Sequence, residues 1–271
     1  MFPRLAHKLR RARMHYREAG LLNTIEIACA YGYVPPWLYF RQGTHLLRLR
    51  SRAHVMKFGP RPDYRYFIAG RTHVDELASL DNGEDFRFMR RLFLDFLSHD
   101  ALCYAIAKHD RIVAYNWLFR HQYVVTNDGY GPRQLRLMLG EHHAMFGNGY
   151  IVPEYRLKGL FPSLLWMAVN DRPADTVFLT TIARMNTDSL RAHERIGFEK
   201  LGTILCRRVI STACRWSMES PSRNQAIGRG QPAVALDSLI VPDWAREGGD
   251  DQPGDVVPDD RRSSATHGGK K

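Results

Sequence analysis

The chain has 271 residues, enough for one large domain or for one domain with extensions, and its 44% hydrophobic content suffices for a real core. The formal net charge is +11, and the 32 Lys and Arg against 20 Asp and Glu of residues 1–220 give that part +12. A basic body suits an anionic ligand, a nucleic acid or an anionic membrane surface, although many basic proteins bind none of these.

Four cysteines occur without a CxxC pair, in apolar or strand-like stretches, at Cys29, Cys103, Cys206 and Cys214. We interpret them as reduced, small hydrophobic residues of a cytoplasmic protein. The sequence has no GxxxxGK, which argues against a P-loop nucleotide site. It also has no HExxH or other metal-ligand spacing, so no metal site is expected.

Residues 1–20 predict a basic amphipathic helix, because their apolar residues fall near one helical face among six cations. The apolar stretch 21–40 is about long enough to span a bilayer, but Glu26 and the Pro35-Pro36 pair argue against a span. No small-residue cleavage site marks a signal peptide. We therefore expect residues 1–50 to be a helical extension that packs on the body, with weak contact of residues 1–20 to a membrane surface as the alternative.

Residues 51–219 read as alternating strands and helices. Strands are expected at 64–69, 101–119 (a hairpin turning at His109 and Asp110), 133–139, 144–152, 176–183 and twice in 199–218, and helices at 84–99, after Gly159 and at 187–198. This order predicts an α/β (mixed α+β) domain with helices on the faces of a mixed sheet. Residues 220–271 are rich in Gly, Pro, Asp and Ser without apolar periodicity, so we expect a disordered tail.

An anion site is predicted where the strand 144–152 gives way to the next helix. Pro162 is tolerated only in the first turn of a helix, so the helix must begin close to Gly159. The amides of residues 157–161 are then free at the positive end of a helix dipole, and Arg156 and Lys158 flank them. Such a turn suits a pyrophosphate, whereas an ordinary strand-to-helix turn with solvated cations is the alternative.

A second segment, "NTDSLRAHERIG", places Asn186, Ser189, His193 and Gly197 three, four and four residues apart. On an α-helix these positions share one stripe, which also holds Leu190 and therefore faces the core or a cleft. Each residue also has a simpler interpretation: an N-cap, a buried histidine and a C-terminal glycine cap.

The segments "VPEYRLKGLFPSLL" and "NTDSLRAHERIGFEKLG" together resemble the acyl-CoA signature and last-helix motif of the GCN5-related N-acetyltransferase (GNAT) family. The resemblance is strong over residues 150–202 and extends by strand order over residues 64–146. It implies a central mixed, mostly antiparallel sheet that is splayed at its middle strands and flanked by helices. The variant "PEYRLKGLFPSLL" is most similar to a bacterial branch found with cell-surface polysaccharide genes.

The resemblance implies an N-acyltransferase that moves acetyl from acetyl-CoA to a primary amine by direct attack, with an amino sugar as one candidate acceptor. The pyrophosphate and the pantetheine arm of this co-substrate would be bound by Val152, Arg156, Leu157, Lys158, Gly159, Leu160, Phe161, Asn186 and Ser189. No metal is implied.

Two residues depart from the family pattern. Phe161 replaces the last Gly or Ala of the phosphate loop, and His193 replaces the tyrosine that protonates the leaving thiolate. A histidine can donate a proton near neutral pH, so we expect His193 to be the acid unless that role has been lost. For the general base we expect the group Glu141, His142 and His143.

Two further hypotheses stay open. The chain could keep the fold but serve as an acyl-CoA-binding or scaffold protein without catalysis. It could alternatively bind an anionic membrane or a nucleic acid through its N-terminal cations, but no recognised nucleic-acid motif occurs, so no specific nucleic acid is expected. The oligomeric state is not predicted.

Overall fold

The computed structural model describes residue 28 and residues 39–80, 85–126, 134–209, 213–220, 224–229 and 232–239. These residues belong to the first of two compact units, residues 1–239. The predicted basic helix of residues 1–20, and Cys29, lie outside the described residues. No helix in the described part of the chain is both long and apolar enough to cross a membrane.

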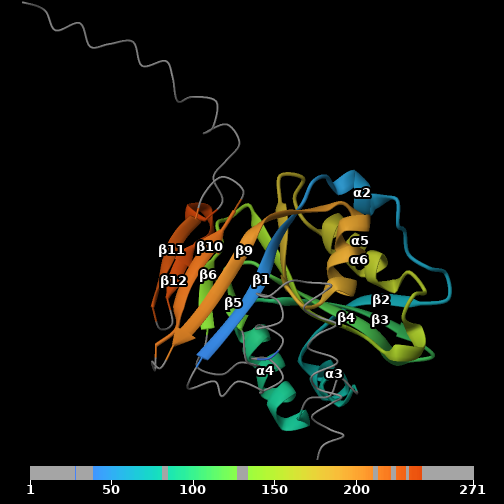
Figure 1. Ribbon diagram of the computed structural model, residues 1–271. Coiled ribbons are helices and arrows are strands. Elements are labelled where there is room, and N and C mark those ends of the chain that lie inside the picture. Colours follow the sequence, from blue (N-terminus) through green and yellow to red (C-terminus); the bar gives the residue numbers. More distant parts are fainter. Residues whose placement is uncertain are drawn as a thin grey trace, which may run out of the picture. The chain divides into compact units, whose positions relative to one another are not determined.

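The described strands form a large sheet in the order β11-β10-β9-β1-β8-β7-β4-β3-β2 (Figure 1). In chain order they are β1 (Tyr39–Leu49), β2 (Arg65–Ala69), β3 (Leu102–Lys108), β4 (Arg111–Phe119), β7 (His143–Ile151), β8 (Val177–Ala183), β9 (Phe198–Val209), β10 (Arg215–Glu219) and β11 (Asn224–Arg229). Neighbours are antiparallel except for β7 and β8, which are parallel. The predicted mixed, mostly antiparallel sheet is confirmed.

Helices cover both faces of this sheet (Figure 1). They are α2 (Arg52–Met56), α3 (Val74–Ser79), α4 (Phe86–Ser98), α5 (Leu160–Asp171) and α6 (Thr187–Ile196), with short 3₁₀ turns η1 (Arg71–His73), η2 (Pro153–Tyr155) and η3 (Leu236–Ser238). On one face, Phe93 of α4 packs its ring against Tyr115 and Trp117 of β4. On the other face, Leu118 of β4 shares a core cluster with Leu164 of α5. Strand β4 is therefore buried between α4 and α5.

Two sequence predictions about the ends of the domain are wrong. Tyr39–Leu49 is a strand between β8 and β9 and not part of a helical extension. Within this strand the adjacent residues Leu46 and Leu47 are both fully buried, one on each face of the sheet. The segment therefore lacks the alternation of apolar and polar residues by which a strand is recognised in a sequence. The second wrong prediction is that the tail is disordered from residue 220 on. Within it, β11 and β12 (Ala233–Ala235) pair with other strands, and Leu236 is buried.

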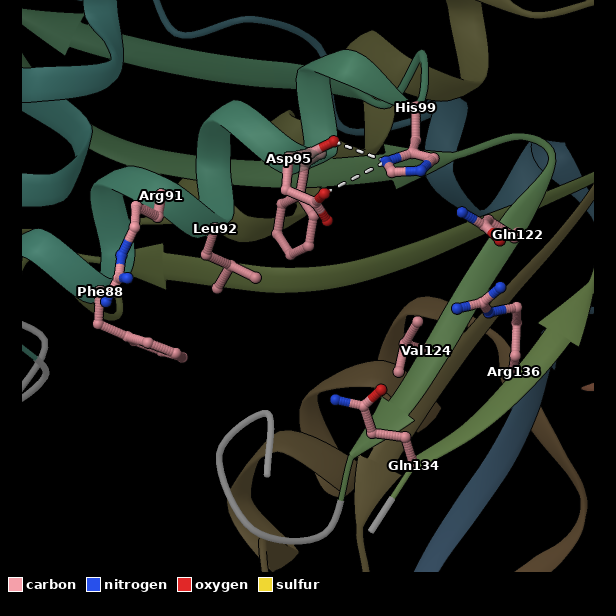
Figure 2. A pocket seen from close by; sticks show the side chains of 10 residues that line it. Phe88, Arg91, Leu92, Asp95, His99, Gln122, Val124, Gln134 and Arg136 are labelled. Atoms are coloured by element: carbon pink, nitrogen blue, oxygen red, sulfur yellow. Dashed lines mark hydrogen bonds and ion pairs between the residues drawn. The ribbon is translucent and has the colours of Figure 1, made fainter. Parts of the chain in front are cut away.

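A second sheet in the order β12-β6-β5 contains β5 (Gln122–Thr126) and β6 (Gln134–Met138), which form an antiparallel pair between β4 and β7 in the sequence. Side chains from this pair and from α4 line opposite walls of one groove (Figure 2). The pair therefore adds a wall beside the main sheet.

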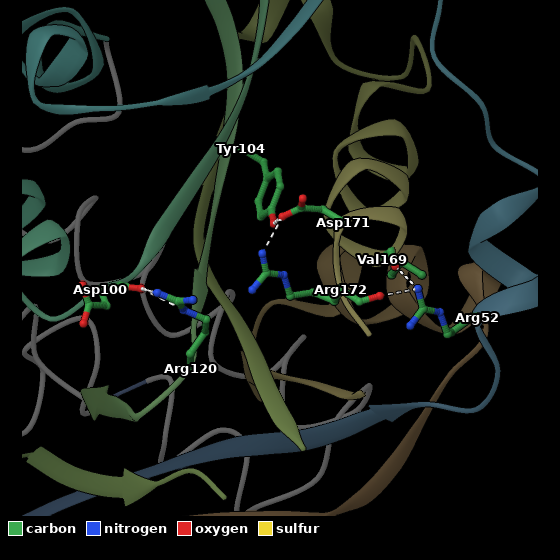
Figure 3. Close-up of polar contacts among 7 residues, drawn as sticks. All are labelled: Arg52, Asp100, Tyr104, Arg120, Val169, Asp171 and Arg172. Atoms are coloured by element: carbon green, nitrogen blue, oxygen red, sulfur yellow. Dashed lines mark hydrogen bonds and ion pairs between the residues drawn. The ribbon is translucent and has the colours of Figure 1, made fainter. Parts of the chain in front are cut away.

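The C-terminal end of α5 is fixed by polar contacts with two other elements (Figure 3). The Tyr104 hydroxyl of β3 donates to Asp171 Oδ2 at 2.6 Å, and Arg172 Nη2 donates to the same oxygen at 2.7 Å. Arg52 of α2 donates to the carbonyls of Val169 and Arg172, the latter at 2.9 Å. A cation on these last carbonyls is favourable because they carry the negative end of the helix dipole.

Tyr104→Phe is expected to destabilise the protein by about 1–2 kcal/mol at neutral pH, because Asp171 loses a hydrogen bond. Burial alone would raise the pKa of Asp171, but the hydrogen bonds from Tyr104 and Arg172 lower it overall. The ionised Asp171 carboxylate therefore stabilises the folded state at pH values above its unfolded-state pKa. This stabilisation is lost as the pH falls through the lowered pKa of the folded state. Urea unfolding at pH 7 and pH 3 should show the difference between the wild type and Tyr104→Phe shrinking at pH 3.

The matched control is Tyr155→Phe, which removes a phenol hydroxyl for which the described residues offer no hydrogen bond. We expect this control to change stability by less than about 0.5 kcal/mol. Equal losses in the two variants, or a Tyr104→Phe loss that is constant with pH, would contradict the account of the α5 end.

Candidate functional site: a cleft between two diverging strands

The parallel strands β7 and β8 separate part of the way along their length. Their pairing runs from His143 and Val177 to Phe146 and Thr180, whereas β7 continues to Ile151. Opposite β4, the pairing shifts by one residue on β7 beyond Gly147, and Asn148 has a φ of 50°. This is the geometry of a β-bulge, which bends a strand locally and frees backbone groups. The splay predicted for the middle strands is confirmed.

The separation of β7 and β8 opens a cleft of about 660 Å³. Its walls come from β4, β7, β8 and the helices α5 and α6. Five of the predicted site residues line it: Arg156, Phe161, Asn186, Ser189 and His193. The structure therefore brings the two sequence segments of the predicted site together around one cavity.

The loop at the mouth of the cleft has the predicted form. Gly159 caps α5 with a φ of 76°, and Pro162 is the third helical residue. Leu157 is fully exposed and has a φ of 60°, which is unusual for leucine. Within the described residues, the amides of residues 157–161 donate no hydrogen bond outside regular elements. These amides and the helix dipole favour an anion.

Three cations surround this loop. Arg156 Nε donates to the Ile151 carbonyl at 3.1 Å, and Lys158 Nζ lies 5.0 Å from the centre of the Tyr155 ring. Arg61, which the sequence reading missed, comes from the segment before β2. A Cβ built on Gly159 would lie 2.6 Å from Arg61 Nη2. The guanidinium therefore occupies the space that only a glycine leaves open there.

Phe161 turns its side chain away from the loop. Its ring centre lies 4.7 Å from that of His193, which in turn lies 5.2 Å from that of Phe198. The half-buried Phe161 thus packs against the core cluster and α6. A bulky residue at this loop position is accommodated without covering the amides.

His193 is not suited to the acid role predicted for it. Burial lowers its pKa to about 4, against the opposing effect of a hydrogen bond with the Ser189 carbonyl. Because a carbonyl only accepts, the 2.7 Å contact requires the proton to be on Nδ1, which donates it. The ring is therefore neutral near pH 7 and its one proton is engaged. These surroundings disfavour the predicted role of His193 as the thiolate acid.

Asn186 and Ser189 occupy the start of α6 as the motif suggested. Asn186 Oδ1 accepts from the Ser189 amide at 3.1 Å, so Asn186 is the N-cap. Gly197 ends the helix with a φ of 106°. Asn186 and Gly197 therefore cap the two ends of α6, as the simpler interpretation suggested. Asn186 and Ser189 also line the cleft.

Glu141 and His142 lie away from the cleft. Both are exposed at the N-terminal end of β7, and His142 Nδ1 is 2.7 Å from Asp175 Oδ2. Neither lines the cleft, whose mouth is at the opposite end of this strand. Their neighbour His143 lies 3.3 Å from Asp237. The structure thus separates Glu141 and His142 from the cleft, because residues before a strand are separated from those after it by its whole length.

Tyr123 of β5 reaches the point where β7 and β8 part. A Cβ on Gly147 would lie 2.9 Å from the Tyr123 hydroxyl, and this hydroxyl lies 2.9 Å from Thr181 Oγ1 on β8. Burial raises the pKa of Tyr123, so its proton is retained at neutral pH. Gly147 and Thr181 both line the cleft, whereas Tyr123 itself lines a small neighbouring cavity that shares Asn148 with the cleft. Sequence patterns gave no signal for this tyrosine, because β5 lies outside both motifs.

No protein-family model and no curated protein matches the sequence. Solved structures with some likeness include a protein of unknown function from Staphylococcus epidermidis ATCC 12228, with 8% identity, a TM-score of 0.45, and coverage of 65% of this chain and 64% of the other. A GNAT-family acetyltransferase from Colwellia psychrerythraea has 9% identity, a TM-score of 0.43, and coverage of 67% and 57%. A GNAT-like protein from Streptococcus suis 89/1591 has 13% identity, a TM-score of 0.43, and coverage of 70% and 68%.

The chain thus spans less than two thirds of the first two of these proteins. At such identities and TM-scores, the likeness says nothing of activity.

Proposed function

We propose that the chain is a GNAT-type N-acyltransferase that transfers acetyl from acetyl-CoA to a primary amine. The observation that carries the proposal is the cleft between β7 and β8, which joins the loop amides at its mouth to the part of β7 that β8 no longer pairs with. An acetyl-CoA molecule has the matching parts: a pyrophosphate, an extended arm with two amides, and a thioester at the tip.

The pyrophosphate is proposed to lie on the amides of residues 157–161, with Arg61, Arg156 and Lys158 around it. The pantetheine arm then enters the cleft and pairs with the edge of β7 beyond Phe146, where β8 has moved away. Its amides replace the missing strand partner, as an added strand would. Asn186 and Ser189 form the wall that faces this arm.

Catalysis is proposed to proceed by direct attack of the amine on the thioester carbonyl, so no covalent enzyme intermediate forms. Most of the rate enhancement then comes from positioning, with a backbone amide of the β7 bulge polarising the carbonyl. The departing thiolate needs a proton, and His193 does not supply it. We assign that role to the Tyr123 hydroxyl, which lies at the strand separation and keeps its proton at neutral pH.

The finer points of the proposal come from the sequence resemblance. An amino sugar is the proposed class of acceptor, and the cytoplasm the proposed location. Weak contact of residues 1–20 with a membrane surface also remains a proposal.

A second candidate function is an acyl-CoA-binding protein without catalysis. It is favoured by one observation, the neutral and hydrogen-bonded state of His193 at the family's acid position.

An acyl-transfer assay separates the two functions. Acetyl-CoA is incubated with a panel of primary amines that includes amino sugars, and free thiol and the mass of the acetylated amine are measured. We expect a product with the wild type and at least about a tenfold loss of rate with Ala183→Trp, because this exposed residue lines the cleft and a large ring would fill it. The matched control is Ala183→Ser.

If a folded Ala183→Trp variant still transfers acetyl at the wild-type rate, the reaction takes place outside this cleft. Saturable CoA binding without product on any amine would favour the binding protein.

A further inference from the structure

A groove beside the main cleft is lined by α4 on one side and by β5 and β6 on the other (Figure 2). Its volume is about 530 Å³. A narrow passage of about 40 Å³ shares Asp95, His99 and Gln122 with this groove. The passage shares Asn148 with the proposed CoA cleft. The passage therefore lies between the groove and the β7 bulge, where the proposed thioester would lie.

The passage end of the groove carries a carboxylate and a base. His99 Nδ1 lies 3.6 Å from Asp95 Oδ1 and 2.9 Å from the Asp95 carbonyl. Since a carbonyl only accepts, Nδ1 carries the proton and donates it there. The lone pair of His99 Nε2 is then available to accept a proton, and the carboxylate nearby stabilises the imidazolium that results.

Two cations line the groove, one on each wall (Figure 2). Arg91 of α4 and Arg136 of β6 line the groove but not the passage, and they come from opposite walls (Figure 2). In the described part of the chain, neither guanidinium pairs with a carboxylate. Arg91 precedes Asp95 by four residues, which is roughly 6 Å along a helix. Guanidinium groups bind phosphate and carboxylate oxygens through paired hydrogen bonds.

The rest of the groove lining is mixed. Leu92, Phe96 and Val124 are apolar, while Gln122 and Gln134 bring amide groups from the β5–β6 wall. Apolar surface with a few polar groups is typical of sites for small molecules.

We propose that this groove binds the acceptor, and that the acceptor is a small amine that also carries a phosphate or carboxylate group. The assignment rests on the proposed acyltransferase function and names its substrate class. The ammonium is attracted to Asp95, and the anionic group lies between Arg91 and Arg136.

The reaction then balances as follows. His99 Nε2 takes one proton from the ammonium, and the neutral nitrogen attacks the thioester carbon. The C–N bond forms and the C–S bond breaks, and the sulfur leaves with the bonding electron pair. Tyr123 gives its proton to the thiolate and regains one from the acylated nitrogen, while His99 releases its proton to water.

Two matched pairs of probes test the substrate class: glucosamine 6-phosphate against glucosamine, and 6-aminohexanoate against hexylamine. With acetyl-CoA as donor, we expect the anionic member of at least one pair to have a kcat/KM at least about tenfold higher. A difference within the glucosamine pair indicates a phosphate as the anionic group, and a difference within the hexylamine pair indicates a carboxylate. Arg91→Gln/Arg136→Gln should remove the difference through KM while leaving the affinity for CoA unchanged.

The control is Arg87→Gln/Arg111→Gln, which removes the same charge from exposed residues outside the groove. It should preserve the preference. Binding of each probe to the CoA complex, measured by calorimetry, gives a readout that does not depend on turnover.

Equal affinity and equal kcat/KM within both pairs, or no binding of either anionic probe to a protein that binds CoA, would overturn the groove assignment alone. A folded protein that does not bind CoA would overturn the proposed function beneath it.

Discussion

Tyr123→Phe is expected to lower kcat roughly 100-fold with little change in the KM for acetyl-CoA, the size usual for loss of a general acid. The phenol is the proton donor at the point where β7 and β8 separate, since Gly147 and Thr181 are both within reach of its hydroxyl. Its pKa is raised by burial, so the wild type keeps the proton across the neutral range. Steady-state kinetics with the preferred amine measure the effect.

Thr181→Val is the matched control, because it removes the hydrogen-bond partner and leaves the phenol in place. We expect this variant to retain kcat within a few-fold. If both substitutions lower kcat equally, the contact between Tyr123 and Thr181 is structural, and the assignment of the acid fails.

Replacing Arg61, Arg156 and Lys158 together by Gln is expected to weaken CoA binding about 100-fold at low salt. Exposed ionic contacts contribute up to about 1 kcal/mol each, and three of them amount to roughly two powers of ten in affinity. The free amides of the loop stay in place, so weak binding should remain. Calorimetry at two salt concentrations measures the loss, which should shrink at high salt because exposed charges are screened.

The control is a second triple variant, Arg71→Gln/Arg87→Gln/Arg111→Gln, with the same change in net charge at exposed positions away from the cleft. It should bind CoA nearly as the wild type does. Equal weakening in the two triples would mean that the protein's overall field, not the loop, attracts the phosphates.

Local features of this fold were predictable from the sequence. The turn at His109 and Asp110 has φ values of 49° and 60°, the left-handed conformation that a two-residue hairpin needs. The start of α5 followed from Gly159 and Pro162, since the two residues restrict where a helix can begin. Such signals lie within a few residues of the structure they determine.

Features that depend on contacts between distant segments were not predictable. Tyr39–Leu49 pairs with β8 and β9, and its own residue pattern does not indicate which strands it pairs with. Arg61 meets Gly159 only because the segment before β2 lies beside the start of α5. The same holds for the groove, whose walls are separate in the sequence.

Two of the predicted catalytic residues have surroundings that the sequence did not reveal. His142 was expected near the site because it precedes a strand that leads there, but it lies at the other end of that strand. His193 was expected to donate a proton because free histidine titrates near neutral pH. Its burial between Phe161 and Phe198 keeps the ring neutral instead.

The most direct test of the central claim is calorimetric titration of CoA, and separately of pantetheine, into the wild-type protein at physiological salt. We predict saturable one-to-one binding of CoA and at least about a tenfold weaker affinity for pantetheine, which lacks the phosphates that the loop would hold. Equal affinities for the two, or no binding of CoA by a folded protein, would contradict the assignment of the cleft.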